Sequence, residues 1–162
     1  LSMKKLNKNN KGFSLVELLV VIAIMVVLVG VLAPTLLGNI EKSRVSSDIQ
    51  VLDSIAGAIQ SAIGSDEKAY TDAMSIAGAE YTVDGLYTGT VNTKDVTNLK
   101  NLMDEYLAKS KIAFKGTEAK TAYNTTARLK FQVSANGTIT VKLYKNDTDV
   151  LTAKNVKYEV TR

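Results

Sequence analysis

The longest hydrophobic stretch lies near the start of the chain, where residues 18–33 form an unbroken run of sixteen non-polar residues. The apolar segment around this run extends over residues 13–37, which is 25 residues. A helix of that length measures about 37 Å at a rise of about 1.5 Å per residue, whereas the hydrocarbon core of a bilayer is about 30 Å thick. The pattern therefore predicts a helix that can span a membrane.

Beyond Pro34 the solid apolar pattern becomes a stripe whose members recur at steps of mostly three or four residues, as on one face of a helix. The stripe consists of Leu36, Leu37, Ile40, Val45, Ile49, Leu52, Ile55, Ile59 and Ile63. The intervening polar residues are Glu41, Lys42, Arg44, Asp48, Asp53 and Gln60. The helix is therefore predicted to continue over residues 38–64, to place its apolar face under a globular head and to stop at Gly64. An independent coiled coil is the alternative, and it is disfavoured because heptads are not sustained.

The last part of the chain, residues 127–162, has the alternation of a half-buried antiparallel sheet. Apolar and polar residues alternate over 129–133 and again over 139–143, and Asn136-Gly137 between them predicts a two-residue hairpin. A third strand is expected over residues 156–160. Together these elements predict an α+β fold, in which the long N-terminal helix packs against a three- or four-stranded antiparallel sheet.

Residues 65–126 form a less regular region between the helix and the sheet. Helical patterns are present over 66–77 and 95–109, whereas Gly85–Gly89 and Lys115–Thr117 are predicted to be loops. An adhesive face is one use for six tyrosines of the head, but most of them are expected to be half-buried packing residues: Tyr81, Tyr87, Tyr106, Tyr123, Tyr144 and Tyr158.

The composition excludes several classes of chemistry. There is no Cys and no His, so disulfides, Cys or His nucleophiles, Ser-His-Asp triads and zinc-finger ligand sets are all absent. Asp147 and Asp149 are candidate calcium ligands, but two carboxylates fall far short of the six to eight oxygen ligands of calcium, so a plain turn is favoured. No enzyme activity, metal or cofactor is predicted.

Positive charge is concentrated in the first dozen residues, which are polar and have no apolar periodicity. The lysines there are Lys4, Lys5, Lys8 and Lys11. Without them the 20 basic residues fall to 16, equal to the 16 acidic residues, so strong nucleic-acid binding by the head is not expected. We interpret residues 1–12 as a leader peptide, and their charge predicts an N-terminus on the cytoplasmic side with the head outside.

Three interpretations of the apolar segment compete. A secretory signal cut after Ala33 is disfavoured, because Pro34 at the scissile bond lacks an N–H and has a fixed φ. A simple single-pass anchor explains the length and the lysines. It does not explain Glu17, since a carboxylate in a membrane helix costs about 2.5 to 3.5 kcal/mol at the centre and somewhat less near the end.

Glu17 acquires a role if the chain is cut between Gly12 and Phe13. The new α-ammonium then lies four residues from Glu17, and in a stack of identical helices the ammonium of one copy can pair with the carboxylate of another. Glu17 would then select the axial offset of the stack, as a single polar residue fixes register in a coiled coil.

The segment Lys11-Gly12-Phe13-Ser14-Leu15-Val16-Glu17-Leu18 resembles the cleavage and methylation motif of type IV pilins and type II secretion pseudopilins. The resemblance implies cleavage between Gly12 and Phe13, N-methylation of Phe13, and Glu17 as the fifth mature residue. It also implies a helix break at Gly30 and Pro34, with residues 26–34 extended in the filament. The missing cysteine pair departs from the disulfide loop common in Gram-negative pilins and favours a Gram-positive type.

The function implied by this resemblance is that of a structural subunit, a major pilin, polymerised with copies of itself through the N-terminal helix. The implied partners are a prepilin peptidase, a pilus assembly ATPase and an inner-membrane platform protein. The subunit would reside in the cytoplasmic membrane before assembly and in an extracellular pilus afterwards, with adhesion or surface motility among its roles. The alternatives are a major pseudopilin or competence pilin and, from another class, an anchored extracellular binding protein that never polymerises.

Overall fold

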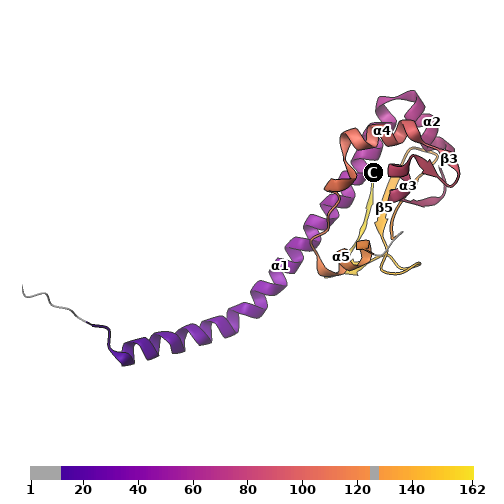
Figure 1. The fold of residues 1–162 in the computed structure, drawn as a ribbon. Helices are drawn as coiled ribbons and strands as arrows, with labels where there is room; N and C mark the ends of the chain where they lie inside the picture. Colours follow the sequence, from indigo (N-terminus) through magenta and orange to yellow (C-terminus); the bar gives the residue numbers. More distant parts are fainter. Residues whose placement is uncertain (1–11, 125–127) are drawn as a thin grey trace, which may run out of the picture. The chain divides into compact units, whose positions relative to one another are not determined.

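The computed structural model describes residues 12–124 and 128–162. Its first helix, α1 (Leu15–Ser65), is continuous over 51 residues (Figure 1). The chain divides into two compact units within this helix, Leu1–Asn39 and Ile40–Arg162. The second unit is called the head.

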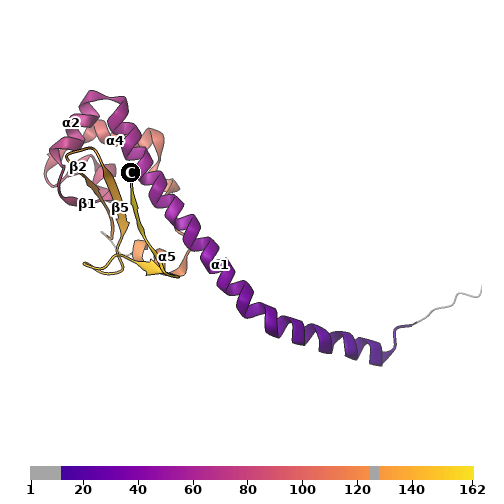
Figure 2. The ribbon, with the colours of Figure 1, turned by 180° about the vertical axis from the view of Figure 1, so that it is seen from behind.

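The head contains a four-stranded antiparallel sheet with the strand order β1-β4-β5-β8. Its strands are β1 (Glu80–Thr82), β4 (Leu129–Val133), β5 (Ile139–Leu143) and β8 (Glu159–Thr161). Figures 1 and 2 show the sheet beside the second half of α1. Buried residues of both elements belong to one hydrophobic core, so the predicted α+β fold is confirmed.

The helical side of this core comes from the part of α1 that lies in the head. Its buried apolar residues are Val45, Leu52, Ile55, Ala56, Ala58, Ile59 and Ala62. The first three members of the predicted stripe, Leu36, Leu37 and Ile40, are exposed. Asp48 is fully buried, so its assignment to the polar side of the helix is wrong. Asp48 lies three residues after Val45 and four before Leu52, which places it on the apolar face despite its charge.

Five shorter helical segments complete the head. They are α2 (Glu67–Ser75), α3 (Val83–Thr88), α4 (Thr97–Tyr106), the 3₁₀ helix η1 (Lys109–Lys111) and α5 (Thr117–Asn124). Helices α2 and α4 lie where helical patterns were predicted, over residues 66–77 and 95–109. The loop predicted over Gly85–Gly89 is wrong, because α3 occupies most of it and ends at Gly89 with φ of 79°. Gly85 is accommodated inside this helix by a bond from its own N–H to the Thr82 hydroxyl, which caps the first turn.

The β4–β5 hairpin has a three-residue loop, so the predicted two-residue loop is wrong. Val133 pairs with Ile139, and the Ser134 N–H donates to the Thr138 carbonyl at 2.8 Å. Gly137 alone in this loop has a positive φ, of 83°, whereas a two-residue type I′ loop needs two such residues. Its N–H donates to the Ser134 carbonyl, which is the pattern of a turn closed by a left-handed glycine.

The third C-terminal strand is also different from the prediction, because residues 156–160 contribute to two separate ladders. β7 (Val156–Lys157) pairs with β6 (Thr152–Ala153), and only β8 joins the main sheet. Tyr158 lies between them, with its N–H bonded to the Leu151 carbonyl and its own carbonyl accepting from the Leu143 N–H. The short β6–β7 hairpin therefore projects from the end of the sheet.

Two hairpins of the head have two-residue loops made of non-glycine residues with positive φ. In the loop between β2 (Thr90–Val91) and β3 (Lys94–Asp95) these are Asn92 and Thr93, at 46° and 67°. In the β6–β7 loop they are Lys154 and Asn155, at 50° and 65°. A left-handed conformation costs an L-residue about 1–2 kcal/mol, and a β-branched side chain such as that of Thr93 is especially unsuited to it.

Thr93→Gly is expected to stabilise the head by about 1 kcal/mol, because the loop then has the Asn-Gly sequence that type I′ hairpins prefer. Thermal unfolding of the full chain in detergent, followed by circular dichroism, should show a midpoint a few degrees higher. Thr93→Ala is the control, since alanine retains the Cβ that causes the strain and should bring no such increase. An equal increase in both variants would contradict the assignment of the strain to this backbone conformation.

Candidate processing and assembly segment

The first helical turn is closed by the side chain of Glu17. The Ser14 N–H donates to Glu17 Oε2 at 2.9 Å, and the Leu18 N–H donates to the Ser14 carbonyl at 3.2 Å. This is one half of a capping box, in which an N-cap serine is followed three residues later by a glutamate that reaches back to its backbone. The carboxylate also lies at the positive end of the helix dipole, where a negative charge is favoured.

This contact changes the interpretation of Glu17 that its sequence position suggested. Its carboxylate has a hydrogen-bond donor within the single chain, so an assembled neighbour is not needed to give it one. A carboxylate has about four lone-pair sites, however, and the single hydrogen bond from Ser14 to Oε2 leaves acceptor capacity for an ammonium group. Pairing with another copy remains a proposal that the cap does not prevent.

Gly12 and Phe13 precede the helix and are accessible. Neither residue is in a helix or strand, and Phe13 is 83% exposed. A Cβ added to Gly12 would meet no atom within 4 Å. The predicted scissile bond is therefore on an open segment two residues before the first helical residue. The predicted leader lysines, Lys4, Lys5, Lys8 and Lys11, lie outside the described residues.

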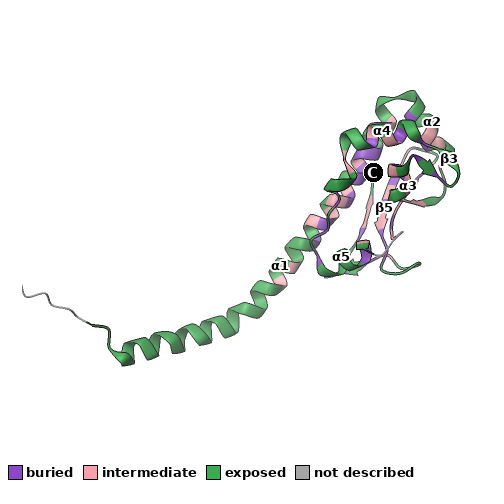
Figure 3. Ribbon diagram, in the orientation of Figure 1, coloured by how far each residue is buried: buried purple, intermediate pink, exposed green. Residues whose placement is uncertain are grey.

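The apolar half of α1 is exposed along its whole length among the described residues. Every residue from Gly12 to Leu37 is exposed, as the uniformly green first half of the helix in Figure 3 shows. The helix contains an 18-residue window with a mean hydropathy of 3.2, none of which is buried. It is long and apolar enough to cross a membrane by length and composition. Such a surface is stable in lipid or against other apolar helices, and unstable in water.

Gly30 and Pro34 are one helical turn apart in this segment. Proline has no N–H to donate to the carbonyl four residues earlier, and here that carbonyl belongs to Gly30. Both residues thus weaken the same turn, although α1 remains helical through them in the single chain. Extension of residues 26–34 in a filament stays a prediction.

Comparison with known proteins assigns this segment. Residues 7–33 match the family model of the prokaryotic N-terminal methylation motif. The chain carries the class III signal peptide of type IV pilins and pseudopilins. No curated protein and no solved structure matches the chain significantly.

The methylation motif supports a type IV pilin-like or pseudopilin-like structural subunit. It implies processing by prepilin peptidase and assembly into pilus-like polymers. Together with the apolar helix, it fits a membrane-anchored pilin-type protein before assembly. The match covers residues 7–33 only, and the head lies outside it.

Asp48 is the residue in the head whose importance the sequence pattern missed. Its Oδ1 accepts from the Lys115 N–H at 2.5 Å, and its Oδ2 accepts from the Gly116 N–H at 2.8 Å and the Tyr158 hydroxyl at 3.1 Å. Burial and the adjacent carboxylate raise the pKa of Tyr158, which keeps its hydroxyl a donor. Asp48 therefore joins α1, the start of α5 and the end of the sheet.

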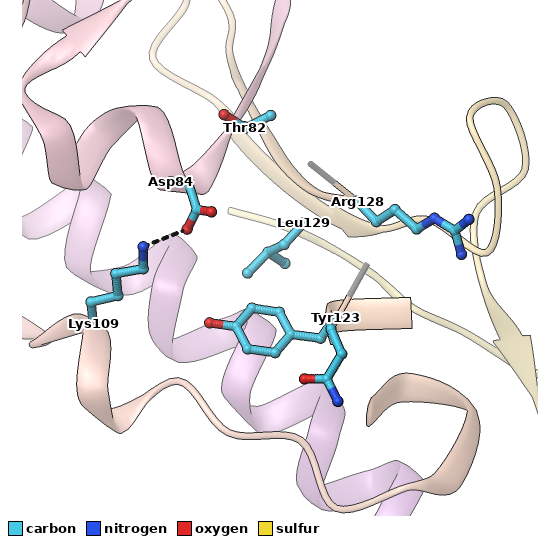
Figure 4. Close-up of a pocket in the computed structure, with 7 residues that line it drawn as sticks. Thr82, Asp84, Lys109, Tyr123, Arg128 and Leu129 are labelled. Carbon is cyan, nitrogen blue, oxygen red and sulfur yellow. Dashed lines mark ion pairs between the residues drawn. The ribbon is translucent and has the colours of Figure 1, made fainter. Parts of the chain in front are cut away.

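A small polar cavity of about 220 Å³ opens elsewhere on the head (Figure 4). Lys109 Nζ and Asp84 Oδ1 form an ion pair of 2.9 Å at its wall, and the hydrogen bond that Lys109 donates to Asp84 raises the pKa of Lys109. Burial raises the pKa of the nearby Tyr123. Figure 4 shows the Arg128 side chain directed away from the ion pair, and its guanidinium donates to the Lys145 carbonyl. The charged groups are thus engaged with partners from the head itself.

The calcium candidates Asp147 and Asp149 lie in a turn that Asn146 organises. Asn146 Oδ1 accepts from the N–H groups of Thr148 and Asp149, and its Nδ2 donates to Asp149 Oδ2. A turn near Asn146 to Asp149, as predicted, is thereby confirmed. Within residues 12–124 and 128–162, no cluster of three or more acidic side chains is arranged to hold a metal ion.

Proposed function

We propose that this chain is a structural subunit of a type IV pilus, cut between Gly12 and Phe13 and polymerised through the apolar half of α1. The observation that carries the proposal is the coincidence of the methylation motif with the apolar half of α1, whose surface is wholly exposed. A membrane satisfies this surface before assembly. Packing against the same helices of other copies satisfies it after extraction from lipid.

Processing supplies the charge that assembly requires. Cleavage after Gly12 converts the Phe13 amide into an α-ammonium, and N-methylation leaves that group charged. The ammonium of one copy then pairs with the Glu17 carboxylate of another and fixes their offset. A pilus assembly ATPase and an inner-membrane platform would extract the subunits, which have their N-termini on the cytoplasmic side and their heads outside. Adhesion or surface motility would then be roles of the finished filament.

Gly12→Val is expected to block maturation when the chain is expressed with an active prepilin peptidase. Intact-mass analysis of the membrane fraction should show the native chain beginning at N-methylated Phe13 and the variant retaining residues 1–12. The control is Gly38→Val, which adds the same side chain in the same compact unit, residues 1–39. A Cβ at either position meets no atom within 4 Å, so neither substitution creates a clash within the chain.

A native chain that keeps residues 1–12 beside a peptidase proved active on another substrate would contradict the proposal. It would then favour the permanent single-pass anchor, which has no use for a new ammonium group. Equal loss of cleavage in both glycine variants would show a general defect of insertion instead of recognition at the junction.

A further inference from the structure

An apolar groove of about 430 Å³ lies on the head beside the lower part of its α1 segment. Val45 and Ile49 of α1 and Val156 of the β6–β7 hairpin supply its apolar lining. Val156 is 40% exposed, although it is a β-branched residue in a strand. An apolar groove with this much exposure at its edge is typical of a surface that another protein covers.

The rim of the groove is cationic. Lys42 on α1 and Lys154 on the β6–β7 hairpin line it from its two sides. Among the residues that the structure describes, no ion pair involves either lysine. Lys154 is also one of the left-handed residues of the hairpin loop, a conformation that costs about 1–2 kcal/mol. Strain of this kind at a surface site favours a functional contact there.

The α2 end of the head carries an exposed aromatic ring and a negative charge that complement this apolar, cationic groove. Tyr70 on α2 is 50% exposed, the largest exposed fraction of any large hydrophobic residue that the structure describes in the head. Glu67 lies three residues earlier on the same helix, so its exposed carboxylate shares a face with the Tyr70 ring. No ion pair of the described residues involves Glu67.

Tyr106 is the other exposed tyrosine, at 46%, and it matches the groove less well. The residues three and four positions before it, Met103 and Leu102, belong to or pack against the core and carry no charge. The nearby Asp104 already pairs with Lys100 at 2.9 Å. Tyr70 with Glu67 is thus the exposed aromatic that has a free carboxylate on its own face.

We propose that the α2 face of one copy, with Tyr70 and Glu67, docks into the Lys42–Lys154 groove of a second copy. The inference rests on the proposed function and assigns the contact between heads in the filament. Ser65, where α1 ends before α2, is about 15 residues beyond the groove, or about 22 Å along the helix. The two surfaces are therefore distinct, and a contact between them is head-to-tail. Each pair of copies keeps one α2 face and one groove free to bind further copies.

The absence of native cysteine allows a direct test in assembled filaments. Ser46→Cys places a thiol at the exposed edge of the groove, and Thr71→Cys places one beside Tyr70. Because the two positions lie too far apart within one chain for a disulfide, oxidation of the double variant should give a ladder of cross-linked multimers. The matched control combines Thr71→Cys with Ser54→Cys, which is exposed on the same α1 helix but does not line the groove.

Charge reversal in the double-cysteine chain tests whether Glu67 and Lys154 contribute to the same contact. Adding Glu67→Lys to the double-cysteine chain should lower the cross-linked yield at least about tenfold, since a like charge in a contact costs on the order of 1.4 kcal/mol or more. Adding Lys154→Glu as well should restore much of the yield. Glu105→Lys, which reverses another exposed carboxylate of the head, is the control and should leave the yield unchanged.

Filament formation is measured separately, by sedimentation and electron microscopy of the unoxidised protein. Absence of filaments from the native chain with an active assembly system would contradict the proposed function itself. Filaments that form without the Ser46–Thr71 ladder, or that cross-link equally through Ser54, would overturn only the docking proposal. Dimers from Ser46→Cys alone would also overturn it, because they would show two grooves facing each other.

Discussion

Glu17→Gln is expected to stop filament assembly while membrane insertion and cleavage continue. Glutamine has the shape of glutamate and can accept the Ser14 N–H bond that closes the first helical turn. It lacks the charge that attracts the α-ammonium of another copy. Opposite charges about 4 Å apart attract by about 4 kcal/mol at an effective dielectric constant of about 20, so loss of this pairing should lower filament yield at least about tenfold.

Comparison with Glu17→Ala separates the effect of the cap from the effect of the charge. It removes both, so it should match the glutamine variant in filament yield and show additional fraying at the start of α1. Cell-surface filaments collected by shearing give the yield, and carbonate extraction of membranes gives insertion. Normal filament yield from Glu17→Gln would show that the carboxylate acts only through the cap, and the ammonium pairing would then have to be abandoned.

The long helix could be predicted from the sequence because its signals are local and repeated. The solid apolar run and the stripe that follows it each extend over many residues, and the stripe agrees with the buried residues of the head from Val45 to Ile59. The strands β4 and β5 were also clear, since both have strictly alternating burial. Gly64 was a sufficient signal for the end of the helix, which the structure places at Ser65.

The remaining details depend on contacts between distant segments, which a local pattern does not record. A buried carboxylate at Asp48 is tolerable only because Lys115, Gly116 and Tyr158, far along the chain, direct donors at it. The glycines of residues 85–89 suggested a loop, although one lies within α3 and the other ends it. Burial of Val83 and Leu86 against the head outweighs the low helix propensity of Gly85.

The cap at the start of α1 has a signal in the sequence. Ser14-Leu15-Val16-Glu17 has the spacing of a capping box directly before an apolar run. The charge of Glu17 in a membrane helix favours a partner for its carboxylate in another copy. The structure adds a partner in the same chain, and the two roles use different lone pairs of one carboxylate.

The three backbone N–H groups that precede and begin α5 depend on acidic side chains of α1. Asp48 accepts from Lys115 and Gly116, and Glu41 Oε1 accepts from Thr117 at 3.1 Å. The start of a helix has N–H groups without partners in the helix, and here α1 provides the acceptors from a distance. Gly116 fits because a Cβ there would lie 2.7 Å from Asp48 Oδ2.

Asp48→Ala is accordingly expected to destabilise the head by about 3–5 kcal/mol, because it leaves two backbone N–H groups and the Tyr158 hydroxyl without their acceptor. Domains are stable by only about 5–15 kcal/mol, so most of the margin is lost. Tyr158→Phe removes one of the three bonds and should cost about 1 kcal/mol. Glu41→Ala removes a single exposed bond from the same helix start and should cost no more than that.

Urea unfolding of the full chain in detergent distinguishes these three variants, since all seven tyrosines lie in the head and report on it by near-ultraviolet circular dichroism. If Asp48 is a buried acceptor shared by several donors, Asp48→Ala should lose the most unfolding free energy, and Tyr158→Phe and Glu41→Ala should lose less. Equal small losses in all three would mean that water replaces the Asp48 carboxylate at little cost. In that case the attachment of α5 to α1 would rest on apolar packing instead of on these hydrogen bonds.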